Sequence, residues 1–350
     1  MRTLLACLAL CTAALGTAAH AQTPLFSADT ELQLIIEGPL NTLIREAPRS
    51  TDPHPATVTL VGAGEPSRFE IELAARGLSR RTRGNCTMPP LRLDFDGDAL
   101  SGSVLQGQNR IKLVTRCRTG AVFEQVNAHE YLAYRLYNEI TPLSYRVRPV
   151  RVTYRDTEGR RREETQLNFL VEDIDDVADR NRLVALEVQS NEVRISQLDG
   201  QAAARFALFQ YMISNLDWDM LFARPDADDC CHNSKLLAAS QEARTSIIPV
   251  PYDFDSSGLA DAPYAGVPES LPVRNVRQRL WRGYCRHNAE LPAAIAHFQS
   301  RREAINAVIA SEPRLSESRR QSTRRYIDEF FELIADPARV DSQLIRRCRD

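Results

Sequence analysis

The chain changes its pattern of apolar residues near Glu172, and this change constrains its fold more than any other feature. Before Glu172, short runs alternate apolar and polar residues or are rich in β-branched residues, with Gly and Pro between them, as is typical of strands. After Glu172, apolar residues recur at helical spacing. The pattern predicts an α+β protein with a β-rich N-terminal lobe over residues 22–173 and a mainly helical C-terminal lobe over residues 174–350.

The predicted elements are short in the first lobe and longer in the second. Strands are expected at residues 57–61, 69–75, 91–95, 110–115, 145–154 and 166–171. Helices are expected at residues 122–140, 202–215, 291–309 and 317–335. The chain has 350 residues, of which 43% are apolar, so it is long enough for one large core or two medium ones.

The N-terminal residues predict an exported protein. Residues 1–21 contain Arg2, an apolar run and the small-residue pattern Ala19-His20-Ala21, which is typical of a secretory signal cleaved after Ala21. No other apolar run approaches the ~20 residues that a membrane helix needs, so no integral membrane segment is expected. The net charge of −2 gives no general attraction to nucleic acid. We therefore expect a periplasmic or secreted location and no nucleic-acid partner.

Six cysteines follow the predicted signal: Cys86, Cys117, Cys230, Cys231, Cys285 and Cys348. An even number in an exported chain predicts three disulfides. Cys86 and Cys117 lie beside neighbouring predicted strands and are expected to bond each other. Because adjacent cysteines are poorly placed to bond each other, Cys230 and Cys231 are each expected to reach Cys285 or Cys348, and which pairs with which stays open.

Polar residues follow two apolar segments in residues 214–258. Asp217 ends the first segment, Asn233 follows it along the chain, and Asp253 and Asp255 end the second. Mg²⁺ prefers such oxygen ligands, and the order acid, Asn, acid is used in phosphoryl transfer for a base and two metal ligands. The alternative is a set of turn and capping residues, because Asp and Asn favour both. Asp228 is an alternative base, but it lies in a polar loop, whereas an apolar helix fixes Asp217.

The use of lysine is a second indication. Among the 44 basic residues only Lys112 and Lys235 are lysines. Lysine is a compact point charge that can contact a phosphate, and arginine does not replace it there. We therefore expect Lys112 to bind phosphate, although chance could also place two lysines in these segments. The basic loop at residues 76–83 either holds phosphate or is a solvated turn.

The order of these segments resembles the CotH family of atypical protein kinases, named after a spore coat protein. The matching segments are Arg76-Gly77-Leu78-Ser79-Arg80, Lys112, the helix with Glu130, Phe169-Leu170-Val171-Glu172, Asn215-Leu216-Asp217, His232-Asn233 and Pro251-Tyr252-Asp253. The resemblance covers about residues 69–258. It implies a two-lobed protein-kinase-like fold and phosphorylation that depends on Mg²⁺ and ATP.

The resemblance also implies a role for each site residue. Asp217 would accept the proton of the attacking hydroxyl, and Lys112 would contact the α- and β-phosphates. Glu130 would orient Lys112, with Glu172 as the alternative partner. The Mg²⁺ ligands would be Asn233 and Asp253, with Asp255 as a possible third.

Three functions follow for a chain of this kind. The first is an exported kinase-like phosphotransferase that acts on a protein or envelope hydroxyl. The second is a kinase-fold binding or envelope-assembly module without catalysis. The third is a metal-dependent hydrolase that uses the same acids. Binding of a nucleotide with Mg²⁺ distinguishes the first from the other two.

Overall fold

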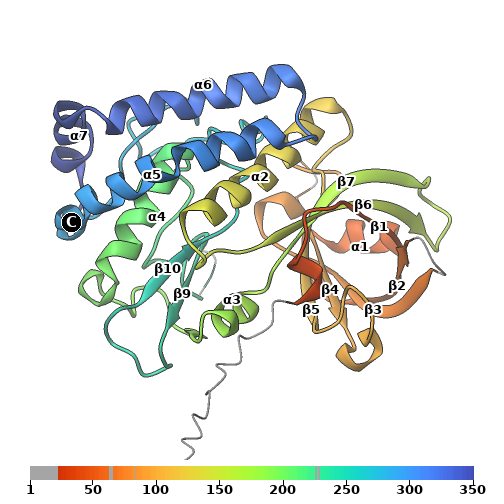
Figure 1. The fold of residues 1–350 in the computed structure, drawn as a ribbon. Coiled ribbons are helices and arrows are strands. Elements are labelled where there is room, and N and C mark those ends of the chain that lie inside the picture. The colour runs from red at the N-terminus through yellow and green to blue at the C-terminus, as the bar shows by residue number, and fades with distance from the viewer. Residues whose placement is uncertain (1–22, 63–65, 83, 225–226, 228) are drawn as a thin grey trace, which may run out of the picture.

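A computed structural model describes residues 23–62, 66–82, 84–224, 227 and 229–350. Its first half is a closed barrel of seven strands in the order β1-β2-β3-β4-β5-β7-β6. The strands are β1 (Leu32–Gly38), β2 (His54–Val61), β3 (Ser67–Ala75), β4 (Leu91–Phe95), β5 (Arg110–Val114), β6 (Val147–Asp156) and β7 (Glu164–Val171). Neighbours in the barrel are antiparallel except β1 and β6, whose parallel pairing aligns Leu32 with Val150 and closes the barrel (Figure 1).

The predicted two-lobed protein-kinase-like fold is therefore wrong, because a closed barrel replaces the open sheet of a kinase N-terminal lobe. The deciding element is β1, which the sequence did not single out as a strand. Alternation within a run shows that one face is buried, but it does not show which other strand a sheet edge will meet. Here β1 joins β2 on one side and β6 on the other.

Apolar side chains fill the barrel from alternate positions of its strands. They form one buried cluster that includes Leu34, Ile36, Val58, Leu73, Leu93, Ile111, Leu113, Val150, Val152 and Leu170. The short helix α1 (Leu40–Glu46) adds Leu40 and Leu43 to the same cluster. Each such side chain stabilises the fold by about 1.5–3 kcal/mol when it leaves water. The alternation also sends Lys112, between Ile111 and Leu113, to the outside of the barrel.

The helices form the second half together with one helix from the first. They are α2 (Ala121–Ile140), α3 (Ile174–Arg180), α4 (Gly200–Ile213), α5 (Leu291–Ser311), α6 (Glu317–Ile334) and α7 (Pro337–Gln343). Figure 1 shows α2 beside α5, and Leu132 of α2 shares one buried cluster with Phe209 of α4, Phe298 of α5 and Phe330 of α6. This core crosses the predicted boundary at residues 173 and 174.

A second, small sheet lies among the helices, with strands in the order β10-β9-β8. Its strands are β8 (Val184–Ala185), β9 (Ser234–Ala238) and β10 (Ile248–Pro251). The antiparallel register of β9 and β10 pairs Ser234 with Pro251. This pairing places the residues that precede β9 beside the residues that follow β10.

The described residues form three disulfides. The predicted Cys86–Cys117 bond is confirmed. The prediction for the others is wrong, because Cys285 bonds Cys348 and the adjacent residues Cys230 and Cys231 bond each other. The backbone explains the Cys285–Cys348 bond. Tyr284 forms a β-bridge with Arg349, and this bridge brings the adjacent residues Cys285 and Cys348 together.

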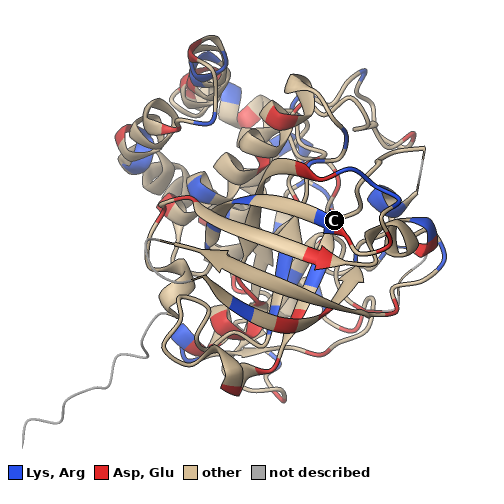
Figure 2. Ribbon diagram, turned by 90° about the vertical axis from the view of Figure 1, so that its right-hand side faces the viewer, with Lys and Arg blue, Asp and Glu red and all other residues tan. Residues whose placement is uncertain are grey.

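Within the described ranges, no helix is both long and apolar enough to span a membrane. The predicted secretory signal, residues 1–21, lies outside the described residues. Basic and acidic residues are interspersed along the chain (Figure 2), in keeping with the small net charge.

Candidate functional site

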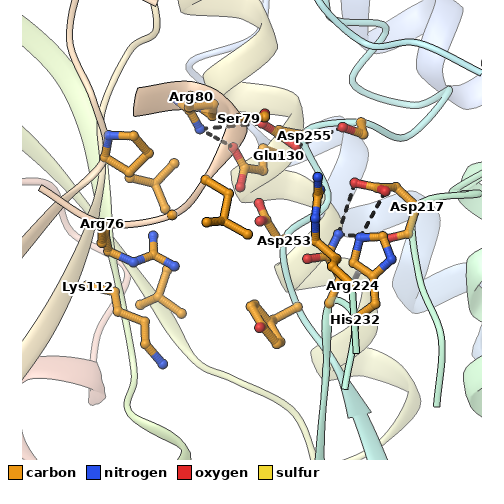
Figure 3. A pocket seen from close by; sticks show the side chains of 18 of the residues that line it. Arg76, Ser79, Arg80, Lys112, Glu130, Asp217, Arg224, His232, Asp253 and Asp255 are labelled. Atoms are coloured by element: carbon orange, nitrogen blue, oxygen red, sulfur yellow. Dashed lines mark hydrogen bonds and ion pairs between the residues drawn. The ribbon is translucent and has the colours of Figure 1, made fainter. Parts of the chain in front are cut away.

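A cavity of about 310 Å³ lies where the barrel meets the helical half. Six of the seven predicted site residues line it: Lys112, Glu130, Asp217, Asn233, Asp253 and Asp255. They come from β5, α2, the segment after α4, and the residues that flank β9 and β10. Figure 3 shows Arg76 and Lys112 on one side, Asp217 and His232 on the other, and Asp253 between them.

Glu172 is the predicted residue that is not in the lining of this cavity. Its buried carboxylate lies 3.0 Å from Nε of Arg180 and accepts a hydrogen bond of 2.9 Å from the backbone N–H of Arg146. Glu172 thus fastens the end of β7 to α3. The predicted pairing of Glu172 with Lys112 does not occur.

Lys112 pairs with Asp173, an acid that was not predicted as its partner. Its Nζ lies 3.7 Å from Oδ2 of Asp173 and about 6 Å from two ring centroids, at 5.6 Å from Tyr145 and 6.0 Å from Tyr252. Burial lowers the pKa of Lys112 to about 8, and Asp173 partly opposes that shift. The amine therefore keeps a proton at neutral pH and pairs with Asp173.

Glu130 binds a different cation. Nη1 of the buried Arg80 lies 3.6 Å from Oε2 of Glu130 and 3.6 Å from Oδ2 of Asp255, and the guanidinium also donates to the carbonyl of Thr115. Burial raises the pKa of Glu130, Asp255 raises it further, and Arg80 opposes both. Glu130 is therefore part of a buried network and not the partner of Lys112.

Two further side chains engage Asp255. Its Oδ1 accepts from Ser256 Oγ at 3.2 Å, and its Oδ2 accepts from Tyr264 Oη at 3.1 Å. Together with Arg80, these contacts occupy both carboxylate oxygens. Asp255 thus has little free capacity to bind a metal ion.

Asp253 differs from its neighbour Asp255. Among the described residues, no group donates a hydrogen bond to its carboxylate, while its backbone N–H donates to Tyr134 Oη at 2.9 Å. Burial raises the pKa of Asp253 to about 7, and the charge of Asp255 adds to this rise while Arg76 and Arg80 oppose it. A nearby cation would relieve the repulsion between the two carboxylates.

The backbone at Asp253 and Asn233 is also unusual. Their φ angles are 61° and 51°, in the left-handed region that residues other than glycine seldom adopt. The carbonyl of Asn233 accepts from the N–H of Tyr252 at 3.1 Å, so each segment holds the other. Strained backbone of this kind gathers at functional sites.

Asp217 is held on three sides. Nδ2 of Asn233 donates to the carbonyl of Asp217 at 2.6 Å and to its Oδ2 at 3.1 Å, and Nε2 of His232 lies 3.0 Å from its Oδ1. The N–H of Asp217 donates to Oδ1 of Asn215 at 3.1 Å. Burial alone would raise the pKa of Asp217, but contact with His232, with smaller contributions from Arg224 and Asn233, brings it below the usual value.

Several residues that line the cavity have no role assigned from the sequence. Arg76 and Arg80 belong to the basic loop that was predicted to hold phosphate or to be a solvated turn, and Arg80 is instead buried in an ion-pair network. Lys235 was noted for its rarity and for its place within residues 214–258 but was given no role, and it lines the cavity with Lys112. His232 stood in the matched His-Asn pair without an assigned role. The rarity of lysine was the signal that could have given Lys235 a role in phosphate binding.

Two further findings concern the predicted metal site and the alternative base. Within the described chain, no group of three or more His, Cys, Asp or Glu side chains is arranged to hold a metal ion. Asp228, the alternative base, lies outside the described residues.

No protein-family model matches the chain, and no curated protein matches it. The resemblance to the CotH family thus stays a prediction.

Proposed function

We propose that the protein is a phosphotransferase that uses a nucleotide and Mg²⁺ to phosphorylate a hydroxyl on a protein or envelope acceptor. One observation carries the proposal: a single cavity combines a cationic wall with an acidic centre in which Asp253 has no hydrogen-bond donor among the described residues. The proposal does not depend on a kinase fold. We further propose that the protein acts in the periplasm or outside the cell, on the basis of its predicted signal and its three disulfides.

The cationic wall is suited to a phosphate chain. Arg76, Lys112 and Lys235 line the cavity, and the two lysines are the only ones in the sequence. In a chain that otherwise uses arginine, the presence of both lysines in one cavity supports a requirement for a point charge. Three cationic side chains in one cavity favour an anionic ligand over a neutral one.

The acidic centre is suited to Mg²⁺. This ion takes one or two carboxylates and completes its shell with phosphate oxygens and water, so a full protein cage is not required. Asp253 would hold it, with Asn233 beside it, whereas Arg80 and Tyr264 occupy Asp255. When bound, Mg²⁺ would neutralise charge on the phosphates.

Asp217 is placed to accept a proton from the acceptor hydroxyl. His232 and Asn233 hold its carboxylate, and its lowered pKa keeps it ionised at neutral pH. Arg76 and Lys112 lie on one side of Asp253, and Asp217 lies on the other (Figure 3). This arrangement supports transfer from a phosphate on the cationic wall to a hydroxyl at Asp217, with catalysis by positioning and charge stabilisation.

Titration of the purified protein with nucleotides tests the proposal, with and without Mg²⁺. A nucleotide that binds only the folded state raises the melting temperature, and the stabilisation is about 2.7 kcal/mol at a ligand concentration of 100 Kd. We expect this rise to need Mg²⁺ and to vanish in Asp253→Asn. Asp261→Asn is the matched control, because this exposed aspartate lies outside the cavity lining. A melting temperature that no nucleotide changes would contradict the proposal.

A metal-dependent phosphate-ester hydrolase is the second candidate. The observation that favours it is the contact between Asp217 and His232, both of which line the cavity and could activate water instead of a hydroxyl. Release of inorganic phosphate from simple phosphate esters, without nucleotide, would favour the hydrolase. Binding without turnover of any substrate would favour a binding module.

A further inference from the structure

Two arginines outside the cavity lining contact the segment that carries Asp217. Arg282 and Arg349, here called the arginine clamp, both come from the C-terminal part of the chain. Nη1 of Arg282 donates to the carbonyls of Leu216 and Trp218, at 2.5 and 2.9 Å. These are the carbonyls on either side of Asp217, so one guanidinium fixes the backbone at this residue.

Arg349 reaches the same segment from another direction. Its Nη1 donates to Oδ2 of Asp219 at 3.0 Å, and its Nη2 donates to Tyr284 Oη at 3.1 Å. The guanidinium groups of Arg282 and Arg349 lie 4.8 and 5.1 Å from the ring of Trp218. Trp218 in turn donates from Nε1 to the carbonyl of Asn215 at 2.8 Å. The clamp therefore holds both neighbours of Asp217.

The contact continues to the second segment of the site. The backbone N–H of Asp219 donates to the carbonyl of His232 at 2.9 Å. His232 lies 3.0 Å from Oδ1 of Asp217. The clamp thus acts on Asp217 in two ways. It holds the backbone on either side of Asp217, and it holds the segment that contacts His232, the residue beside the Asp217 carboxylate.

A disulfide sets the position of Arg349. The Cys285–Cys348 bond lies next to a β-bridge between Tyr284 and Arg349. Within this bridge the N–H of Cys285 donates to the carbonyl of Arg349 at 2.8 Å, and the N–H of Arg349 donates to the carbonyl of Gly283 at 2.9 Å. The clamp is therefore attached to a cross-linked part of the chain.

We infer that Arg282 and Arg349 are positioning residues that hold Asp217 in the geometry needed to accept the proton of the acceptor hydroxyl. The inference rests on the proposed function. Neither arginine lines the cavity, so neither is placed to bind a ligand within it. Both act through Asp217, which takes part in the transfer step and not in nucleotide binding. Displacement of a reacting group by about 1 Å costs on the order of 10²-fold in rate.

Conservative variants test the clamp. Arg282→Lys and Arg349→Lys keep the charge but lose the planar guanidinium, which lies over the ring of Trp218 in both residues and in Arg349 also donates from two nitrogens. We expect kcat for transfer to fall about 100-fold in each variant while KM for the Mg²⁺–nucleotide stays at the wild-type value. Arg346→Lys is the matched control, because this arginine is 74% exposed and pairs with Asp341 outside the site. It should keep both constants.

Amide hydrogen exchange gives a readout that does not need activity. Exchange at residues 216–219 and at His232 should be faster in both clamp variants and unchanged in the control. Wild-type exchange in those residues would overturn the clamp, and so would equal losses in kcat and in nucleotide affinity. If Arg282→Lys fails to fold, Arg349→Lys, at a position where the side chain is 29% exposed, decides the question. A wild-type protein without any transfer activity would overturn the proposed function, whereas the exchange result would still test the clamp.

Discussion

Arg80 and Glu130 form a buried ion pair, with 3.6 Å between Nη1 and Oε2, and the same nitrogen lies 3.6 Å from Asp255. One cation thus serves two carboxylates. Asp253 takes no part in this sharing, and no described residue donates a hydrogen bond to its carboxylate. The network therefore determines which of the neighbouring aspartates is available to a ligand.

Arg80→Met should strongly destabilise the protein, because it leaves Glu130 and Asp255 buried without their cation. Removal of one partner from a buried ion pair costs about 3–5 kcal/mol. Urea unfolding at neutral pH measures the change in the free energy of unfolding. Arg68→Met is the control, because this arginine is 56% exposed and pairs with Glu37 at 3.8 Å, and a change of at most about 0.5 kcal/mol is expected. Equal costs for the two variants would contradict the network.

Asp253 should make stability fall as pH rises. Its folded-state pKa of about 7 lies above the unfolded value near 3.9, so between these values the folded state binds more protons than the unfolded state. The free energy of unfolding contributed by this group therefore decreases from about pH 4 to pH 7. Urea unfolding of the wild type and Asp253→Asn over this range, without Mg²⁺, measures the difference. Parallel pH profiles would contradict the raised pKa.

Asp217→Asn should separate binding from turnover. The variant loses the group that accepts the proton, and general-base catalysis contributes about 10²–10⁴-fold to rate. We expect kcat to fall within that range while the Mg²⁺–nucleotide affinity, measured by calorimetry, stays at the wild-type value. Loss of affinity together with turnover would show that Asp217 binds the nucleotide instead.

Lys112→Arg should weaken nucleotide binding although the charge is kept. Nζ of Lys112 lies about 6 Å from the ring centroids of Tyr145 and Tyr252 and 3.7 Å from Asp173, and a planar five-donor group cannot occupy the place of a point charge. Calorimetric titration measures the affinity. Arg110→Lys is the control, at an exposed position on the same strand. Wild-type affinity in Lys112→Arg would remove Lys112 from the binding site.

Loss of the Cys285–Cys348 bond should destabilise the protein by about 2–4 kcal/mol. The double variant Cys285→Ser and Cys348→Ser, compared with the wild type in urea, measures this cost. Mass mapping of non-reduced peptides checks the pairing itself. A peptide that joins Cys230 or Cys231 to Cys285 would contradict the structure and restore the sequence-based expectation.

Local patterns predicted the elements well and their assembly poorly. The expected helix at residues 122–140 is α2 (Ala121–Ile140), and the expected strand at residues 91–95 is β4 (Leu91–Phe95). The spacing of apolar residues is a local property, so it shows that α2 buries one face. It does not show that α5, far along the chain, covers that face, or that β1 closes a barrel with β6.

The site was foreseen in its composition but not in its contacts. The rarity of lysine pointed to Lys112 and Lys235, and both line the cavity. The pairing of Lys112 with Asp173 was missed, because ion pairs depend on side-chain positions that only the closed barrel fixes. The role of Arg80 was missed for the same reason, since nothing in a basic loop distinguishes a buried arginine from a solvated one.

The position of α2 has a consequence for the synthesis of the chain. Its apolar residues, Leu132 among them, pack against partners in α4, α5 and α6, all of which leave the ribosome later. Strands β1 to β5 precede α2, but β6 and β7 follow it, so the barrel also cannot close before α2 has emerged. Part of the apolar surface of α2 therefore stays uncovered until the last third of the chain is made, and such surface makes an incomplete chain prone to aggregation.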